Sequence, residues 1–468
     1  MIIFKEICFL IKIISRLTQE SSVNLLGQPH YKNYKMIRLT DLPRILFLFS
    51  LLLIFLTILT YGLPHIGPPF QGLSLPYKTF YRNDLSSSSL NILTLVSLIL
   101  FYGLHRQGTP FGTIFIVMVS FLLPAIGIFL IFLPFYLEDN RLLTIGGACI
   151  TFLKLSLIPV FFFALSNQYF SSKQVKGVYA LFFIIKTIVL FLLFPLFDFF
   201  ITKKSQKIYY FFSGIFSLFS LPCIIYLITR LENFNVFKNP EIEKKKGKTQ
   251  IWIKYLGYLS LFIFSYALAK STISYLSTQT LVLTFTTLEE QVDFIKSSLK
   301  IAYLGTGVAM FLGTLLFLWI RWIHLALTLP LLFIIAGSAG YYLYHYPSLL
   351  NLWFALDLPI SHIKLYLVRF FEISLFSLSP VFFLLMKEVI YMSLPWRLKT
   401  QSKVSFDLFL PLVASAAHIF LVSFPTLDLS KENLIYGFSW IILIFCGFIS
   451  LWAVIKVHKL KTQQLSQF

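Results

Sequence analysis

Charged residues are scarce in this sequence, because Asp, Glu, Lys and Arg make up only 12% of its 468 residues. Soluble globular domains carry about a quarter, so the composition excludes an ordinary water-soluble domain. Acidic residues are scarcer still, 19 against 39 basic ones, which gives a formal charge of +20. The basic residues lie mainly in loops between apolar runs, a pattern that indicates membrane topology and contact with anionic lipid. We therefore expect no nucleic-acid partner.

Cysteine and the common catalytic motifs are also lacking. Three of the four cysteines, Cys149, Cys223 and Cys446, lie inside apolar runs, and their spacing fits neither a zinc site nor a disulfide framework. The sequence contains no Gly-x-x-x-x-Gly-Lys-Ser/Thr loop, no Gly-x-Ser-x-Gly elbow and no His-Glu-x-x-His pair. No loop is long enough to fold as a separate catalytic domain. We expect no metal or cofactor, and no enzyme.

What the sequence does contain is long apolar runs, with 57% hydrophobic residues overall. Ile45–Leu63 and Phe111–Leu137 carry no charged residue over the length of a bilayer, which takes about 20 residues of helix to cross. Lipid offers no partner for backbone polar groups, so such spans must be helical. The fold class is therefore all-α, a polytopic membrane protein.

Twelve transmembrane helices are predicted, and the second is the shortest. Their approximate ranges are 45–66, 89–105, 110–136, 142–167, 177–201, 208–229, 252–276, 299–320, 323–346, 363–386, 405–425 and 434–456.

One longer charged loop divides these helices into two six-helix bundles. We expect five parts along the chain: an N-terminal segment, the first bundle, a linker, the second bundle and a tail, at 1–44, 45–229, 230–251, 252–456 and 457–468.

Orientation follows from the basic residues, most of which fall on one side when the N-terminus is placed in the cytoplasm. Cytoplasmic loops are enriched in Lys and Arg, so both termini are predicted to be cytoplasmic, with the protein in the inner membrane of a bacterium. The loop from Lys203 to Lys207 is the clear exception to this asymmetry. The interrupted apolar segment at the start is either an amphipathic surface helix or the product of an early start codon, with Met36 as the true first residue.

Six plus six helices around a central cytoplasmic loop resemble the layout of the major facilitator superfamily, in which the two halves are related by an axis along the membrane normal. The resemblance implies that spans 1, 4, 7 and 10 line a central cavity. Four basic residues lie within predicted spans, and a charge there requires a reason. Lys154, Lys270 and Arg369 fall in spans 4, 7 and 10, whereas Lys186 falls in span 5.

These charges predict a substrate site. Lys154, Lys270 and Arg369 would form a basic cavity for an anion, with Arg369 near the level of Lys270 and Glu372 one helical turn from Arg369. Guanidinium and ammonium groups are suited to carboxylate and phosphate. The alternative is that Glu372 neutralises Arg369, while Lys186 snorkels to the interface. A proton-relay role for His418, within span 11, is a further hypothesis.

Several stretches resemble the ATP/ADP translocase family of intracellular bacteria and plastids. The segment Phe163-Ala-Leu-Ser-Asn-Gln-Tyr resembles the family's Trp-Gly-Phe-Ala-Asn, and the segment from Arg321 to Pro330 resembles Arg-x-Phe-Gly-Trp-x-x-Ala-x-x-x-Pro. Lys387-Glu-Val-Ile-Tyr resembles Lys-Glu-Met-x-Tyr, and Lys403-Val-Ser-Phe-Asp resembles Lys-Ala-x-Ile-Asp. The last two form the most specific run. The resemblance implies an exchange carrier for nucleotides.

Departures from the family pattern affect the substrate more than the fold. The charged cluster that ends the family's first span is replaced by Tyr61-Gly-Leu-Pro-His, and acidic positions in spans 4 and 7 fall near Thr151 and Ser274. A Gly-rich basic stretch after span 10 is replaced by the apolar segment from Leu408 to Ala417.

The sequence thus predicts a monomeric secondary transporter that moves a nucleotide or another phosphorylated, anionic metabolite by alternating access. One alternative is a transporter-like membrane protein without transport activity, acting as a scaffold or partner-binding subunit. Another is a polytopic membrane enzyme, for which Glu138-Asp139 would be the only acidic pair in an outer loop beside a span end.

Overall fold

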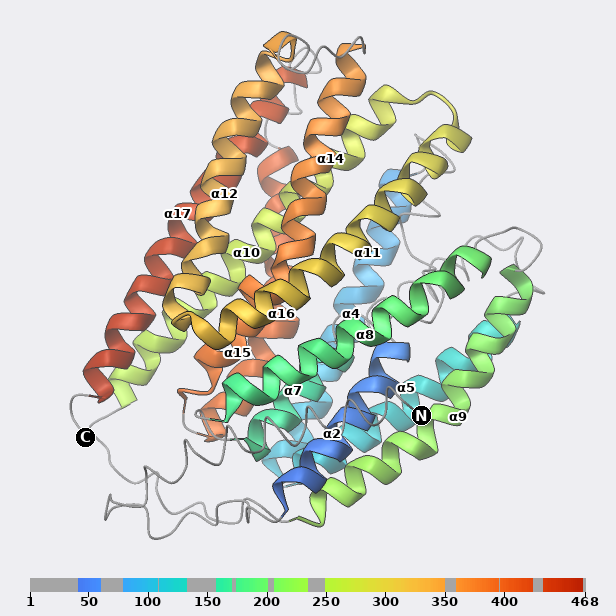
Figure 1. The fold of residues 1–468 in the computed structure, drawn as a ribbon, viewed down its shortest axis with the longest axis vertical. Helices are drawn as coiled ribbons and strands as arrows, with labels where there is room; N and C mark the ends of the chain where they lie inside the picture. The colour runs from blue at the N-terminus through green and yellow to red at the C-terminus, as the bar shows by residue number, and fades with distance from the viewer. Residues whose placement is uncertain are drawn as a thin grey trace. The chain divides into compact units, whose positions relative to one another are not determined.

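The structure is a computed structural model of the chain, and every secondary-structure element among the residues that it describes is a helix (Figure 1). The described residues are 41–59, 79–107, 109–132, 157–170, 174–200, 206–234, 249–349, 359–394, 396–423 and 432–465. Most of the predicted N-terminal segment, most of the predicted linker and Lys154 lie outside these ranges.

Each of the twelve predicted spans contains a described helix or run of helices. The helices in the first half are α2 (Leu42–Thr57), α4 (Thr79–Arg106), α5 (Phe111–Phe132), α7 (Ile158–Tyr169), α8 (Val175–Phe200) and α9 (Gln206–Glu232).

The helices in the second half are α10 (Thr249–Thr284), α11 (Leu288–Trp319), α12 (Trp322–His345), α14 (Ile360–Ser379), η7 (Pro380–Leu385), α15 (Met386–Tyr391), α16 (Trp396–Ser423) and α17 (Glu432–Leu465). The segments α14, η7 and α15 are consecutive and correspond to the single predicted span 363–386.

Seven helices in the described part of the chain are long and apolar enough to cross a membrane, and four shorter apolar helices accompany them. Together with the all-helical architecture, this confirms the predicted fold class of a polytopic membrane protein. Several helices extend beyond the predicted spans; α11 begins at Leu288 and α17 continues to Leu465. Hydropathy marks the part of a helix that lies in hydrocarbon, not the residue at which the helix ends, so the predicted tail at 457–468 is helical as far as Leu465.

The chain divides into two compact units. The first contains residues Met1–Lys245 and Pro395–Val404, and the second contains Lys246–Leu394 and Ser405–Phe468. The boundary at 245 lies inside the segment expected to be a linker. Pro395–Val404 joins the first unit although it follows span 10 in sequence.

Aromatic rings fill the core of the first unit. Phe49 of α2 is fully buried and lies within 5.3 Å, centroid to centroid, of both Tyr169 and Phe170. A second group is centred on Phe161 of α7, which stacks on Phe111 and Phe115 of α5 at 5.2 and 5.4 Å. Such pairs contribute dispersion and quadrupole attraction that persist where lipid removes the hydrophobic driving force between helices.

Small residues allow two long helices of the second unit to pack closely. In Figure 1, α12 and α17 run side by side. A Cβ added at Gly337 of α12 would lie 2.7 Å from the Ile444 side chain, and one added at Gly340 would overlap the ring of Trp440. Close approach of small residues is the usual means by which membrane helices gain packing energy.

This packing predicts that Gly340→Ala destabilises the protein, because the added methyl group must displace the fully buried Trp440. Overpacking of this kind costs about 1–3 kcal/mol. Gly257→Ala in α10 is the matched control, since a Cβ there meets nothing within 4 Å and alanine favours a helix by up to about 1 kcal/mol. Thermal unfolding of the purified protein in detergent should show a lower midpoint for Gly340→Ala alone. Equal midpoints for the two variants would contradict the packing described.

Candidate functional site

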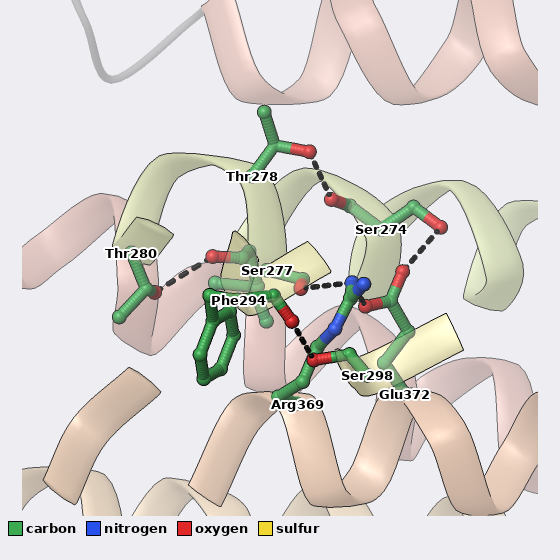
Figure 2. A network of polar contacts seen from close by, with 9 residues as sticks. Ser274, Ser277, Thr278, Thr280, Phe294, Ser298, Arg369 and Glu372 are labelled. Atoms are coloured by element: carbon green, nitrogen blue, oxygen red, sulfur yellow. Dashed lines mark hydrogen bonds and ion pairs between the residues drawn. The ribbon is translucent and has the colours of Figure 1, made fainter. Parts of the chain in front are cut away.

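A polar site lies between α10 and α14 in the second unit (Figure 2). On α10, Lys270, Ser274 and Ser277 are spaced four and three residues apart, which places them on one face of the helix. On α14, Arg369 and Glu372 lie on the face that meets them, followed one turn later by Phe376. Helical periodicity therefore places the polar side chains of each helix on one face.

The contacts join the two helices in antiparallel register. Lys270 Nζ lies 5.1 Å from the centre of the Phe376 ring. Ser274 Oγ donates to Glu372 Oε1 at 3.2 Å, and Arg369 Nη1 donates to Ser277 Oγ at 3.0 Å. From Lys270 to Ser277 along α10, the contacted residues of α14 run in the opposite direction, from Phe376 to Arg369.

Arg369 and Glu372 also form an ion pair between Nη1 and Oε2, as the neutralising alternative anticipated. Glu372 is buried, and the Arg369 side chain is 18% exposed. A carboxylate or guanidinium is costly in hydrocarbon unless it is paired. The ion pair therefore lowers the free-energy cost of burying both Arg369 and Glu372. The pair is held further by Ser274 and Ser277, one on each partner.

One donor of the guanidinium remains without a partner. Arg369 Nε is buried and has no hydrogen-bond partner among the described residues. A buried N–H without a partner costs about 1–3 kcal/mol, and neither Glu372 nor Ser277 accepts from this nitrogen. Lys270 adds a second cation near the middle of the 36-residue helix α10, so two cations and one carboxylate leave one positive charge in excess.

The structure brings together three of the four predicted site residues, Lys270, Arg369 and Glu372. The fourth, Lys154, lies outside the described residues. The register differs from the expected common level of Lys270 and Arg369, because Arg369 is level with Ser277. Seven residues separate Ser277 from Lys270, which is about 10 Å along a helix axis. Ser274 lies where the resemblance places an acidic residue nearby, and in the structure Ser274 Oγ donates to a carboxylate of the facing helix, that of Glu372.

His418 lies in α16 and faces α10. Its ring is 5.3 Å from that of Tyr275, in an edge-on arrangement, and its Nε2 is buried with no hydrogen-bond partner among the described residues. One turn earlier, Ser415 Oγ lies 3.2 Å from Ser271 Oγ. The neighbouring face of α10 thus also carries polar contacts, although His418 does not contact the ion pair.

A second charged network was not predicted as a site. Lys387 Nζ lies 2.8 Å from Asp407 Oδ2, and Tyr391 donates to Asp407 Oδ1 at 3.1 Å; all three residues are buried. Tyr255 donates to the carbonyl oxygen of Ile390 at 2.9 Å, which fixes the end of α15. The signal in the sequence was the run of residues from Lys387 to Asp407 that resembles the translocase pattern. The fold places the charged side chains of this run in contact.

Comparison with known proteins identifies the fold. The structure resembles a major facilitator superfamily transporter, FucP, in the outward conformation, with a TM-score of 0.53, 13% identity and coverage of 88% of this chain and 97% of that chain. It also resembles a bacterial homologue of the iron transporter ferroportin in the outward-facing state, with a TM-score of 0.56, 10% identity and coverage of 89% and 100%. The fold is that of the major facilitator superfamily. No family model matches the sequence, and no curated protein matches it either.

A double-mutant cycle tests the ion pair. Arg369→Gln leaves Glu372 buried without its cation, and Glu372→Gln leaves Arg369 without its anion, so each single change should lower the thermal unfolding midpoint. The double change Arg369→Gln/Glu372→Gln removes both charges and should be less destabilising than the sum of the two, with a coupling of about 1–3 kcal/mol. Additive effects would mean that the two side chains do not stabilise each other.

Proposed function

We propose that this protein is a secondary transporter that moves a small organic anion by alternating access. The fold supports the class of protein, because one structure that it resembles is a major facilitator superfamily transporter and the other is a homologue of an iron transporter. The polar site within the second unit supports a ligand there. The observation that supports this proposal most directly is the buried Nε–H of Arg369. It has no hydrogen-bond partner among the described residues, and it lies in a site that also contains Lys270.

The charge of the site favours an anion. Two cations and one carboxylate would repel a metal cation. The oxygens of a phosphorylated or carboxylated ligand could accept from Arg369 Nε at one level and from the ammonium of Lys270 about two turns away. The related structures do not fix the substrate, because one is titled a fucose:proton symporter and the other a homologue of an iron transporter. The substrate must therefore be inferred from the side chains of this chain.

A nucleotide or another phosphorylated metabolite is the substrate class that we infer, with the chain as a divergent relative of the ATP/ADP translocases. The resemblance of the run from Lys387 to Asp407 supports this relationship, and in the structure Lys387 and Tyr391 both contact Asp407. The site has one positive charge in excess, which fits a substrate with few negative charges. A substrate with more negative charges would need a further cation, such as Lys154. An ion moved between membrane faces must bind the two conformational states differently for its binding to shift them.

Uptake measurements test this function. Cells that express the chain should accumulate one or more members of a panel of radiolabelled nucleotides, phosphorylated metabolites and carboxylates, and Lys270→Gln should lower uptake by about tenfold or more, the worth of one charge-assisted hydrogen bond. Lys270→Arg should retain part of the activity. Lys364→Gln is the matched control, because Lys364 also lies on an aromatic ring, that of Tyr344, at 4.5 Å. Equal uptake by both glutamine variants would remove Lys270 from the site.

Lys154 gives a separate prediction. If Lys154 completes the site, Lys154→Ala should abolish uptake while leaving membrane insertion intact, since losing a charge from a span favours insertion. Immunoblots of isolated membranes measure insertion, and uptake of the substrate found in the panel measures function. Full uptake by Lys154→Ala would show that the site needs only residues of the second unit.

The alternative is a transporter-like protein without transport. The observation that favours it is the ion pair itself, because Glu372 already neutralises Arg369. A wild-type chain that inserts normally but accumulates no member of the panel, with and without an imposed proton gradient, would support this alternative.

A further inference from the structure

Three serines of α10 contact side chains of other helices. Several hydroxyl groups of this helix, that of Thr272 among them, donate to carbonyl oxygens of α10 itself. Ser274 and Ser277 instead contact the ion pair of α14. Ser271, one turn before Ser274, contacts Ser415 of α16, with 3.2 Å between the two hydroxyl oxygens. The polar contacts of α10 therefore continue from α14 to α16.

The pair formed by Ser271 and Ser415 can accept further hydrogen bonds. Ser415 Oγ donates to the carbonyl oxygen of Pro411 in its own helix, at 2.9 Å, so the hydrogen between the two hydroxyl groups belongs to Ser271. Each oxygen then retains a lone pair for another donor. Ser415 is exposed and Ser271 is partly exposed. A donor carried by a ligand can therefore reach this pair.

His418 adds a nitrogen beside the two serines. It lies one turn after Ser415 on α16, and its ring is 5.3 Å from that of Tyr275, which lies one turn after Ser271 on α10. The His418 side chain is 5% exposed, and its Nε2 has no hydrogen-bond partner among the described residues. An imidazole nitrogen donates in one tautomer and accepts in the other, and a hydroxyl group satisfies it in either case. We call Ser271, Tyr275, Ser415 and His418 the α16 subsite.

The α16 subsite lies beside the ion pair but differs from it in charge. Ser271 and Ser274 are one turn apart, which is about 5–6 Å between their Cβ atoms, and Lys270 directly precedes Ser271. The four residues of the α16 subsite carry no permanent charge, whereas Lys270 and the ion pair of α14 are charged. Helix α10 therefore places charged groups next to neutral groups that donate and accept hydrogen bonds.

We propose that the α16 subsite binds the hydroxyl groups of a sugar moiety in the transported anion. The inference rests on the proposed function, because the phosphate or carboxylate of the same molecule would lie at Arg369 and Lys270. One sugar hydroxyl would donate to Ser271 or Ser415, and another would contact Nε2 of His418. The substrate class is thereby narrowed from organic anions to anions that contain a sugar.

A site of this kind should discriminate against a ligand that lacks hydroxyl groups. When the ligand offers no hydroxyl, the polar groups of the site lose their water and gain no partner, and the affinity falls. The anionic group by itself does not provide this discrimination, because it is the same in both ligands. Comparing ligands that differ only in their hydroxyl groups therefore separates the α16 subsite from the anion site.

Calorimetric titration of the purified full-length chain in detergent tests the subsite with two matched pairs of ligands. Ribose 5-phosphate is compared with pentyl phosphate, and gluconate with hexanoate. In at least one pair, the wild type should bind the hydroxylated ligand more tightly by about tenfold or more, the effect of two hydrogen bonds.

Variants at His418 locate the effect. His418→Leu should weaken binding of the hydroxylated ligand by about fivefold, the effect of one hydrogen bond, and leave that of the alkyl ligand unchanged. His418→Gln should retain most of the affinity, since an amide group both donates and accepts. His362→Leu is the matched control and should change neither affinity, because His362 also lies edge-on to an aromatic ring, that of Phe285 at 5.4 Å, outside the subsite.

A serine variant keeps the test decisive if a change at His418 prevents folding. Ser271→Ala should weaken binding of the hydroxylated ligand only, whereas Ser260→Ala, which removes a hydroxyl bonded to the carbonyl oxygen of Gly257 in the same helix, should change neither affinity.

Equal binding of both members of each pair by the wild type would overturn the subsite and leave the anion site standing. An unchanged preference for the hydroxylated ligand in His418→Leu or Ser271→Ala would also overturn it. Failure of all four ligands to bind would overturn the anion site and, with it, the subsite.

Discussion

Hydrocarbon offers no hydrogen-bond partner and little solvation for charge, and this constraint governs every feature of the structure. It requires the spans to be helices, and it requires charges within them to be paired or to serve a ligand. The described chain meets the first demand with long apolar helices. It meets the second with two buried ion pairs in one unit, Arg369 with Glu372 and Lys387 with Asp407. Polar chemistry is therefore concentrated at a few positions, and those positions are informative.

The two ion pairs differ in whether a buried polar group beside them remains without a hydrogen-bond partner. Asp407 is engaged by both Lys387 and Tyr391, so that its carboxylate is bound from two sides within α15 and α16. The Arg369 pair leaves Nε without a partner and has Lys270 nearby on the facing helix. A network whose groups are satisfied specifies packing, whereas a network with an unsatisfied donor is suited to a ligand. This difference is the physical reason for proposing a substrate site at α10 and α14.

Much of the candidate site was predictable from the sequence, because a charge inside an apolar run is conspicuous. Lys270 and Arg369 were identified in this way, and Glu372 was recognised as a neutralising neighbour one turn from Arg369. Ser274 and Ser277 were not identified as partners of these charges, since a serine in a membrane helix commonly bonds to its own backbone. Their role became visible only through the antiparallel register of α10 and α14. The contact between Lys461 and Trp322 was hidden for the same reason, because the two residues are far apart in the sequence.

The sequence by itself determined that this is an all-helical, polytopic membrane protein, because hydropathy is a local property and only a helix satisfies its own backbone polar groups in lipid. It also determined which residues carry costly charge. Only the tertiary structure decided which charges meet. Whether Arg369 is paired, whether Lys387 contacts Asp407 and whether Lys461 lies on Trp322 each depend on helix register and on packing between segments remote in sequence. Side-chain contacts extend over a few ångströms, and no local pattern records which two helices approach to that distance.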